Sequence, residues 1–295
     1  MSIRFVRTFI HVARLGSFSA AARALGMTQS TVSLQMKSLE EEMNAELFDR
    51  SERRPTINGR GHAFLERAEE VVRLYDQLGD AVSGYDDLAG SLKFGAVGSV
   101  VAGILPEALS RLREAHPDLQ TRVVCGLSAD LVVQVDCGDI DAAIVSDPPS
   151  PLAPNLVWTP IDEEPLVVIA AQENGQKRGR ELLKEHPFIR FNRKAWAGRR
   201  IDRVLREQEI QVNEIMELDS LEAISLMVEQ GLGVSLVPQR PIKTPFPASL
   251  HIMPFQGGAY SRSIGMVTRT GSSCAKLIEA LYKILTGTVA AARIK

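Results

Sequence analysis

Residues 17–40 constrain this chain more than any other stretch, because they predict two short helices joined by a tight turn. The first helix, about residues 19–25, is rich in alanine, so another helix can approach it closely. Gly26 follows its last apolar residue, where a helix end favours a positive φ that glycine adopts at little cost. Thr28 then offers its hydroxyl as the N-cap of a second helix. We therefore expect a helix–turn–helix here.

The second helix has an apolar side and a polar side. Val32, Met36 and Leu39 recur at spacings of four and three, which predicts a buried stripe. The other face carries short polar and basic side chains: Gln29, Ser30, Ser33, Gln35 and Lys37. Gln and Ser can hydrogen-bond base edges in the DNA major groove, and Lys can reach phosphate. The alternative is an ordinary helical hairpin with a solvated face.

The residues on either side of this helix pair favour the DNA-binding interpretation. Residues 1–39 contain five basic residues and no acidic one. Residues 47–56 then predict a short extended segment that ends in a basic turn with Arg53 and Arg54. A basic hairpin after a recognition helix is typical of a wing, whose guanidinium groups reach backbone phosphate or the minor groove.

The charge is distributed unevenly along the chain. Residues 1–60 hold nine Lys and Arg against six Asp and Glu, a net charge of +3. The whole chain of 295 residues carries −2, so the remainder carries −5. A basic N-terminal part on an acidic body indicates one nucleic-acid surface.

Residues 3–61 also carry a set of side chains at fixed spacing, and with them the segment resembles the winged helix–turn–helix of LysR-type transcriptional regulators. The matching positions are Phe9, Gly16, Ser17, Phe18, Ala21, Ala22, Leu25, Gln29, Ser30, Val32, Ser33, Leu39, Glu40, Leu47, Phe48, Arg50, Arg53 and Gly61. Asn44 departs from the glycine usual in the family, which is mild because Asn tolerates the left-handed conformation. Residues 57–61 also depart from the family's usual start of the next helix.

This resemblance implies an α+β multidomain chain. Residues 1–60 would be the α-helical winged helix–turn–helix DNA-binding domain, residues 61–90 a long dimerisation helix, and residues 91–295 a two-lobed α/β effector domain resembling periplasmic binding proteins. Lobe I would comprise 91–162 and 265–295, and lobe II 163–264. The residues expected to contact double-stranded DNA are Thr28, Gln29, Ser30, Thr31, Ser33, Gln35, Lys37, Arg50, Arg53 and Arg54.

Residues 61–88 predict one long helix. Apolar side chains alternate spacings of three and four in a coiled-coil seam, at Val71, Leu74, Leu78, Ala81 and Tyr85. A second line, Leu65, Ala68, Val72 and Tyr75, runs beside it. One helix cannot bury so wide a face alone, so it packs either on its own chain or against an antiparallel second subunit. The resemblance favours the subunit and implies a homodimer or homotetramer.

After Gly90 and Ser91 the pattern changes to βαβ units. Strands are expected at 92–97, 121–125, 141–145, 166–171, 188–191, 212–217, 234–237, 251–254 and 263–268. Helices are expected around 109–113, 131–136, 180–184, 199–207, 219–231 and 275–285. Pro106 predicts a loop or a kinked first turn for residues 99–105. Residues 91–295 therefore indicate two α/β lobes.

The resemblance implies two crossings between the lobes, near 161–165 and 260–265, with a ligand in the cleft at the strand ends. Ser99 and Ser128 lie at strand-to-helix turns, where hydroxyls and N–H groups can hold an anion or merely cap a helix. Trp196 could line the cleft or belong to the core. The effector-binding residues expected are Gly98, Ser99, Val100, Ser128, Phe191, Asn192 and Arg193.

Catalysis finds little support in the sequence. The five histidines are scattered without metal-ligand spacing, and nucleophile-elbow, P-loop and dinucleotide motifs are absent. An α/β transferase with a helical appendage is the enzyme alternative. A constitutive DNA-architectural protein is another, but it would not need a two-lobed domain with a cleft. We expect no enzyme activity, no cofactor and no metal, and a small anionic metabolite as effector.

Cysteine usage and hydropathy bear on the compartment. Cys125, Cys137 and Cys274 are widely spaced, which predicts neither a disulfide framework nor a zinc site. Cys125 lies in an apolar run and Cys137 at an expected helix end, so plain burial is expected for both. No run reaches membrane-spanning length and no signal-peptide pattern is present. We expect a cytoplasmic protein with DNA, its own copies, the effector and RNA polymerase as partners and no membrane contact.

Overall fold

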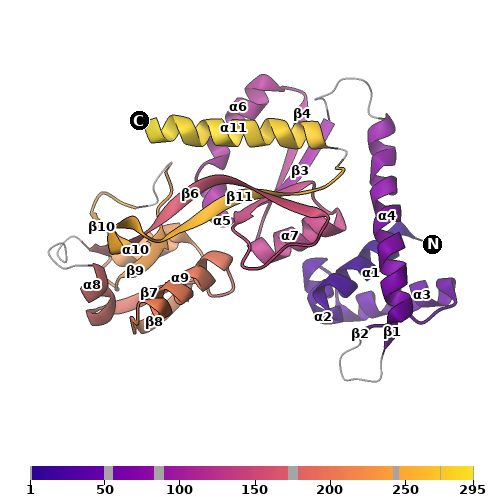
Figure 1. The fold of residues 1–295 in the computed structure, drawn as a ribbon, viewed down its shortest axis with the longest axis horizontal. Coiled ribbons are helices and arrows are strands. Elements are labelled where there is room, and N and C mark those ends of the chain that lie inside the picture. The colour runs from indigo at the N-terminus through magenta and orange to yellow at the C-terminus, as the bar shows by residue number, and fades with distance from the viewer. Residues whose placement is uncertain are drawn as a thin grey trace. The chain divides into compact units, whose positions relative to one another are not determined.

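The computed structural model describes residues 2–49, 56–82, 90–171, 179–241, 246–272 and 274–294. The chain divides into two compact units, residues 1–86 with 132–140 and residues 87–131 with 141–295. The first unit is mainly helical, and the second is built around β-sheets (Figure 1). Among the described residues, no helix is long and apolar enough to cross a membrane.

The first unit contains α1 (Ile3–Leu15), α2 (Phe18–Ala24), α3 (Gln29–Met43), β1 (Phe48–Asp49), β2 (Thr56–Ile57) and α4 (Gly59–Val82). Its core is an aromatic cluster. The Phe9 ring centroid lies 5.5 Å from that of Phe48 and 5.0 Å from that of Phe64, and Phe18 lies 5.1 Å from Phe48. These aromatic contacts join α1, α2, β1 and α4 in one core.

The local signals for the helix–turn–helix are confirmed. Gly26, which directly follows the C-cap residue Leu25 of α2, has the positive φ of +63°. The Thr28 hydroxyl accepts a hydrogen bond from the Thr31 N–H at 3.2 Å and caps α3. Asn44 ends α3 with φ +47°, the left-handed conformation that the family's glycine would adopt.

The first lobe of the second unit is a mixed sheet with helices. It contains β3 (Gly90–Ala96), α5 (Gly98–Ala102), α6 (Leu105–Ala115), β4 (Leu119–Cys125), β5 (Ala142–Ser146) and α11 (Ala275–Ile294), and α7 (Ser128–Cys137) begins here. β3 is parallel to β4 and β5, so the carboxyl ends of these strands share one edge. Leu92, Phe94, Leu281 and Leu285 are fully buried between the sheet and its helices.

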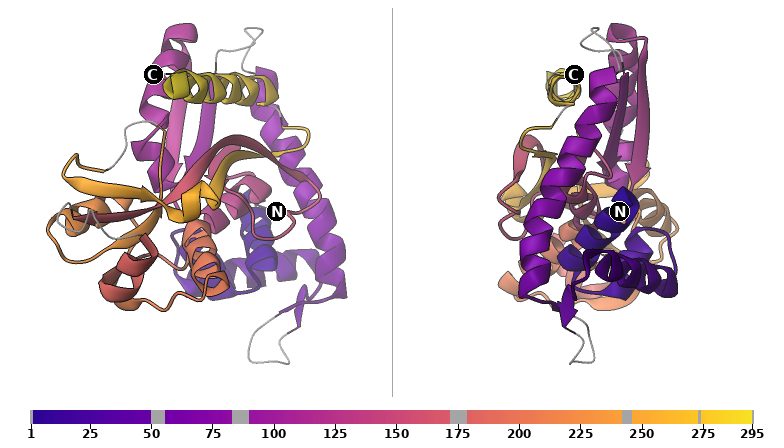
Figure 2. Two further views of the ribbon diagram at one scale, coloured as in Figure 1. Left: turned by 60° about the vertical axis from the view of Figure 1, so that its left-hand side comes forward. Right: turned by 90° about the vertical axis from the view of Figure 1, so that its right-hand side faces the viewer.

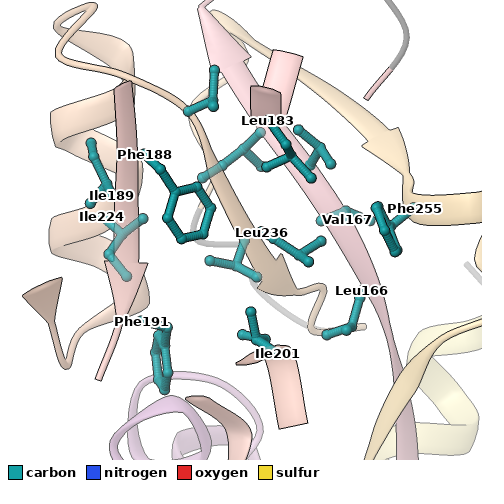
Figure 3. Close-up of a cluster of buried hydrophobic side chains, with 14 of the residues drawn as sticks. Leu166, Val167, Leu183, Phe188, Ile189, Phe191, Ile201, Ile224, Leu236 and Phe255 are labelled. Carbon is teal, nitrogen blue, oxygen red and sulfur yellow. The ribbon is translucent and has the colours of Figure 1, made fainter. Parts of the chain in front are cut away.

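The second lobe surrounds a larger apolar core. It contains α8 (Gly179–Glu185), β7 (Pro187–Phe191), α9 (Trp196–Glu207), β8 (Asn213–Leu218), α10 (Leu221–Glu229), β9 (Ser235–Pro238), β10 (Leu250–Pro254) and the 3₁₀ turn η2 (Phe255–Gly258). β7 is parallel to β8, and a bridge from Phe188 to Val234 joins β7 to the segment before β9. Phe188, Leu236 and Leu183 meet at the centre of this core (Figure 3).

Two long strands connect the lobes (Figure 1, Figure 2). β6 (Leu156–Ala171) and β11 (Ser261–Arg269) pair antiparallel along the first lobe, and β6 continues into the second lobe, where it pairs with β9 and β10. Their register shifts between Ile264 and Gly265. A Cβ on Gly265 would lie 2.4 Å from Trp158 Cε2, so this close approach requires glycine. The chain thus passes between the lobes along β6 and again at the start of β11.

Four expectations about local structure need correction or restriction. Residues 99–105 were expected as a loop or kinked first turn, but residues 98–102 form the short helix α5 and Pro106 lies in the first turn of α6. Cys125 is exposed, because β4 is an edge strand of the sheet. The C-terminal helix extends to Ile294. The helix expected to reach residue 88 is described only to Val82.

Candidate DNA-binding and effector-binding sites

The exposed face of α3 carries the polar side chains expected for base contacts. Thr28, Gln29, Ser30, Thr31 and Ser33 are all exposed. The Gln29 amide oxygen accepts a hydrogen bond from the Ser19 hydroxyl at 2.7 Å, which orients it from α2. Lys37 is 67 % exposed and lies 3.7 Å from Glu41, a weak pair one turn away. This face of the described chain therefore offers donors and acceptors to a partner.

Gln35 follows Thr31 by four residues, but it is less exposed than the other polar residues of that face. Its amide oxygen accepts a hydrogen bond from the Thr8 hydroxyl at 2.7 Å, and its amide nitrogen lies 3.8 Å from Met27 Sδ. The side chain is half-buried and fastens α3 to α1. Its expected exposure was wrong, because spacing along α3 does not tell where α1 packs.

Leu34 is the residue of this face that sequence reasoning missed. It is 66 % exposed, although leucine is usually buried. It follows Ser30 by four residues, which places it on the same helix face one turn further on. An apolar side chain in the major groove can contact the thymine methyl group. The signal in the sequence is a leucine outside the apolar stripe of Val32 and Met36.

A side chain of α3 holds the backbone at Leu47 and Phe48, where the wing begins. The Glu40 carboxylate accepts hydrogen bonds from the Leu47 N–H at 2.8 Å and the Phe48 N–H at 3.3 Å. Asn58 accepts from the Gly61 N–H at 2.8 Å, so it caps α4 in the stretch that departs from the family pattern. The expected wing-tip residues Arg50, Arg53 and Arg54 lie outside the described residues.

The long helix α4 buries only part of its two apolar lines within the first unit. Ala68 and Val72 are buried against the unit's own core. Val71 and Leu74 are 42 % and 50 % exposed, and Tyr75 is 52 % exposed. The expected seam residues Leu78 and Ala81 lie on the same helix, and Tyr85 falls outside the described residues. An apolar stripe of α4 is therefore left without cover by this chain's described residues.

The carboxyl edge of β3, β4 and β5 brings Ser99 and Ser128 to one rim. Ser99 follows β3 in α5 beside Gly98 and Val100, and Ser128 opens α7 after β4. The Ser128 hydroxyl accepts a weak hydrogen bond from the Ser146 N–H at 3.4 Å, at the end of β5. Both serines are buried, so their hydroxyls face the protein and not bulk water.

Two arginines from distant parts of the chain converge on Ser99. Arg262 Nη2, on β11, donates to the Ser99 hydroxyl at 2.8 Å. Arg240 Nη1, just after β9, donates to the Ser99 carbonyl oxygen at 2.8 Å. Both guanidinium side chains are at most 4 % exposed. Nothing in the sequence pattern identified these residues, because each is far from Ser99 along the chain.

Carboxylates balance these arginines. Glu164 on β6 pairs with Arg262 at 2.6 Å, and Glu222 on α10 pairs with Arg240 at 2.8 Å. A small cavity of about 20 Å³ lies beside Ser99, Glu164 and Arg240, with room for about one water molecule. The site therefore holds opposite charges in contact with little free space.

The residues expected to close from the second lobe face elsewhere. Phe191 is buried in the core of its own lobe (Figure 3). Asn192 accepts a hydrogen bond from the Lys194 N–H, and Arg193 pairs with Glu214 and with Glu217 at 3.1 Å. In the described part of the chain, these contacts hold the three residues to neighbours in their own lobe and not to Ser99. Trp196, the first residue of α9, is half-buried.

Cys137 is buried as expected. Burial raises the pKa of its thiol well above the ordinary value, and the nearby Asp139 and Asp136 carboxylates raise it further. Because the thiolate is the reactive form, this shift disfavours reactions of Cys137. No group of three metal-ligating side chains occurs among the described residues.

Two family models match the chain over most of its length. The first, "Bacterial regulatory helix-turn-helix protein, lysR family", covers residues 3–62, and the second, "LysR substrate binding domain", covers residues 86–290. The chain belongs to the LysR family. It is a transcriptional regulator and not an enzyme, with a DNA-binding domain and an effector-binding domain.

Relatives and solved structures of the LysR family agree with this assignment. The HTH-type transcriptional regulator SoxR of Arthrobacter sp. (strain TE1826) is 31% identical over 242 residues, covering 82% of this chain and 81% of SoxR. A probable RuBisCO transcriptional regulator of Cyanidioschyzon merolae is 30% identical over 241 residues, covering 79% and 80%. Full-length OxyR from Pseudomonas aeruginosa, 22% identical, shares the fold with a TM-score of 0.66 over 97% of this chain and 94% of OxyR. Full-length CbnR complexed with its target DNA, 19% identical, shares it with a TM-score of 0.57 over 98% of this chain and 100% of CbnR.

Proposed function

We propose that this LysR-type regulator binds its operators as a homodimer or homotetramer and that a small anionic metabolite between the lobes of the effector domain controls it. The observation that supports an anion is the pair of buried guanidinium groups on Ser99. Each guanidinium is paired with a carboxylate in this structure, so an anion would bind there by replacing one of these carboxylates. RNA polymerase is the further partner that such a regulator would act on.

In the DNA-binding domain, α3 enters the major groove. Gln29, Ser30 and Ser33 hydrogen-bond base edges, Leu34 contacts a thymine methyl group, and Lys37 contacts phosphate. Thr28 and Thr31 add hydroxyls at the helix N-terminus, and Arg50, Arg53 and Arg54 of the wing bind phosphate or the minor groove. Gln35 positions α3 through Thr8.

The dimer forms through α4. The exposed stripe with Val71 and Leu74 pairs with the same stripe of a second copy, and Leu78, Ala81 and Tyr85 extend it. Burying these side chains against a partner supplies about 25 cal/mol for each Å² of apolar surface removed from water. Two recognition helices then face two half-sites on DNA.

In the effector domain, the ligand contacts Ser99 and Ser128 together with the backbone of Gly98 and Val100. The lobes move about β6 and β11, and the second lobe brings Asn192 and its neighbours toward the ligand. Closure of this kind changes the populations of conformations that differ in the spacing of the DNA-binding domains.

The experiment is a metabolite screen on the full-length protein by thermal shift, followed by operator binding with each hit. Ser99→Ala should abolish the response to the effector and leave effector-free operator affinity unchanged. Ser110→Ala, on the exposed face of α6, is the matched control and should respond like the wild type. If Ser99→Ala and Ser128→Ala both respond normally, the anion binds elsewhere.

A further inference from the structure

A second hollow of the effector domain lies between α11 and the strands β6 and β11 (Figure 1). Its volume is about 220 Å³, against about 20 Å³ for the cavity beside Ser99, and the described linings of the two have no residue in common. A cavity of about 150 Å³ already accepts benzene. This α11 hollow therefore has room for a ligand with one ring.

Two paired strands and one helix form the walls of the α11 hollow. Thr159 on β6 and Met266 on β11 are directly opposed in the antiparallel register, and Thr268 lies two residues further along the same face of β11. The Tyr282 hydroxyl of α11 donates a hydrogen bond to the Pro160 carbonyl oxygen at 2.8 Å, which joins the helix to β6. A site on strands and a helix holds its side chains in place better than a site on loops.

The most buried side chains of this lining are apolar. Met266 is 1 % exposed and Ile278 is 7 % exposed, and Tyr282 adds an aromatic ring. The polarisable sulfur of methionine makes favourable contacts with aromatic rings. This part of the hollow suits the apolar or aromatic body of a ligand.

The polar side chains of the lining are available to a ligand. In the described part of the chain, the hydroxyls of Thr159, Thr268 and Ser272 form no hydrogen bond. Arg269 is half-buried at the end of β11, and its guanidinium group forms neither a hydrogen bond nor an ion pair with the described residues. Hydroxyls and a guanidinium group are donors from which an anion accepts hydrogen bonds.

The charges of the lining favour a monoanion. Among the described residues that line the hollow, Arg269 and Glu279 are charged. The Glu279 carboxylate is already paired with Lys283 at 2.7 Å, one helix turn further along α11. One positive charge, that of Arg269, is therefore left for a ligand to neutralise.

We infer that the α11 hollow is a second ligand site of the effector domain, separate from the cleft of the proposed function, and that it binds a small monocarboxylate with one aromatic ring. The carboxylate accepts hydrogen bonds from the planar fork of Arg269 and from the hydroxyls of the strands, and the ring packs on Met266 and Ile278. Because β6 and β11 both connect the lobes, a ligand bound here contacts both connections.

The inference is tested with phenylacetate as the probe, titrated calorimetrically into full-length protein up to about 50 mM. Phenylacetate should bind, and phenylacetamide, its neutral analogue, should not. Arg269→Gln should weaken phenylacetate binding at least about 10-fold, because the charged hydrogen bonds are lost. Arg269→Lys, which keeps the charge but loses the fork, should weaken it less. Thr268→Val keeps the shape without the hydroxyl and should weaken it about 3- to 10-fold.

Arg122→Gln is the matched control, because Arg122 is an exposed arginine on β4 of the same sheet and lies outside this lining. It should bind phenylacetate like the wild type. The inference is overturned if the wild type does not bind phenylacetate up to about 50 mM, or if Arg269→Gln binds it equally well. Loss of binding in Ser99→Ala would also overturn it, since phenylacetate would then occupy the cleft of the proposed function. So would displacement of phenylacetate by an equal concentration of inorganic phosphate, because the apolar lining would then contribute nothing.

Discussion

The buried ion pair between Glu164 and Arg262 gives a sharp test of the structure. Glu164→Gln keeps the shape of the side chain and removes its charge, which leaves the Arg262 guanidinium uncompensated. Because the two side chains are 6 % and 2 % exposed, solvent screens them little. Losing one partner of such a pair costs about 3–5 kcal/mol.

That cost converts into a change of melting temperature. For a unit of 150–250 residues, about 1 kcal/mol corresponds to roughly 2–4 °C, so Glu164→Gln should lower Tm by about 6–20 °C. The double variant Glu164→Leu with Arg262→Met removes both charges and should recover most of the loss. Glu163→Gln, the exposed neighbouring residue, should cost less than about 1 kcal/mol.

Intrinsic fluorescence provides the assay. The chain has two tryptophans, Trp158 and Trp196, and both lie in the second unit. Their emission therefore follows the unfolding of the effector domain without a signal from the DNA-binding domain. A Glu164→Gln variant within about 1 kcal/mol of the wild type would refute the reasoning, since it would mean that water reaches Arg262.

Three further predictions address DNA, assembly and pH. Lys37→Ala should reduce the slope of log affinity for DNA against log salt concentration by about one unit. Lys283 is similarly exposed and also pairs with a glutamate one helix turn away, so Lys283→Ala is the control and should leave the slope unchanged. Leu74→Asp should abolish the dimer in analytical ultracentrifugation because the dimer would bury a charge, and retained dimers would exclude this stripe as the interface. Burial alone would raise the pKa of Glu214, but hydrogen bonds from Arg193 and Arg190 lower it below the ordinary 4.5. Its stabilising contribution is present above pH 4.5 and lost as pH falls through the lowered value, so Glu214→Gln should flatten the loss of Tm below pH 4.5 measured by fluorescence.

The helix–turn–helix could be predicted because its signals are local. Gly26 and Thr28 fix the turn and the cap through backbone conformation and one hydrogen bond within three residues. Periodicity likewise predicted two apolar lines side by side on α4, one with Ala68 and Val72 and one with Val71. These features depend on spacing along a single element.

The arginines of the effector site could not be found in this way. Arg240 is 141 residues from Ser99 and Arg262 is 163 residues away, and only the fold brings them together. Cys125 was misjudged for a related reason, since an apolar run predicts a strand but not its position at the end of a sheet. Gln35 was misplaced because the neighbour that covers it belongs to another helix.

The contact between Gly61 and the wing has a mechanical consequence. A Cβ on Gly61 would lie 2.2 Å from the Leu47 carbonyl oxygen, and the Asn58 N–H donates to that same oxygen at 3.0 Å. The first turn of α4 is thus joined to the strand that carries the wing. In the proposed dimer, a rotation of α4 would therefore turn β1 with it. The angle between the two long helices would then set which separation of half-sites on DNA the two DNA-binding domains reach at once.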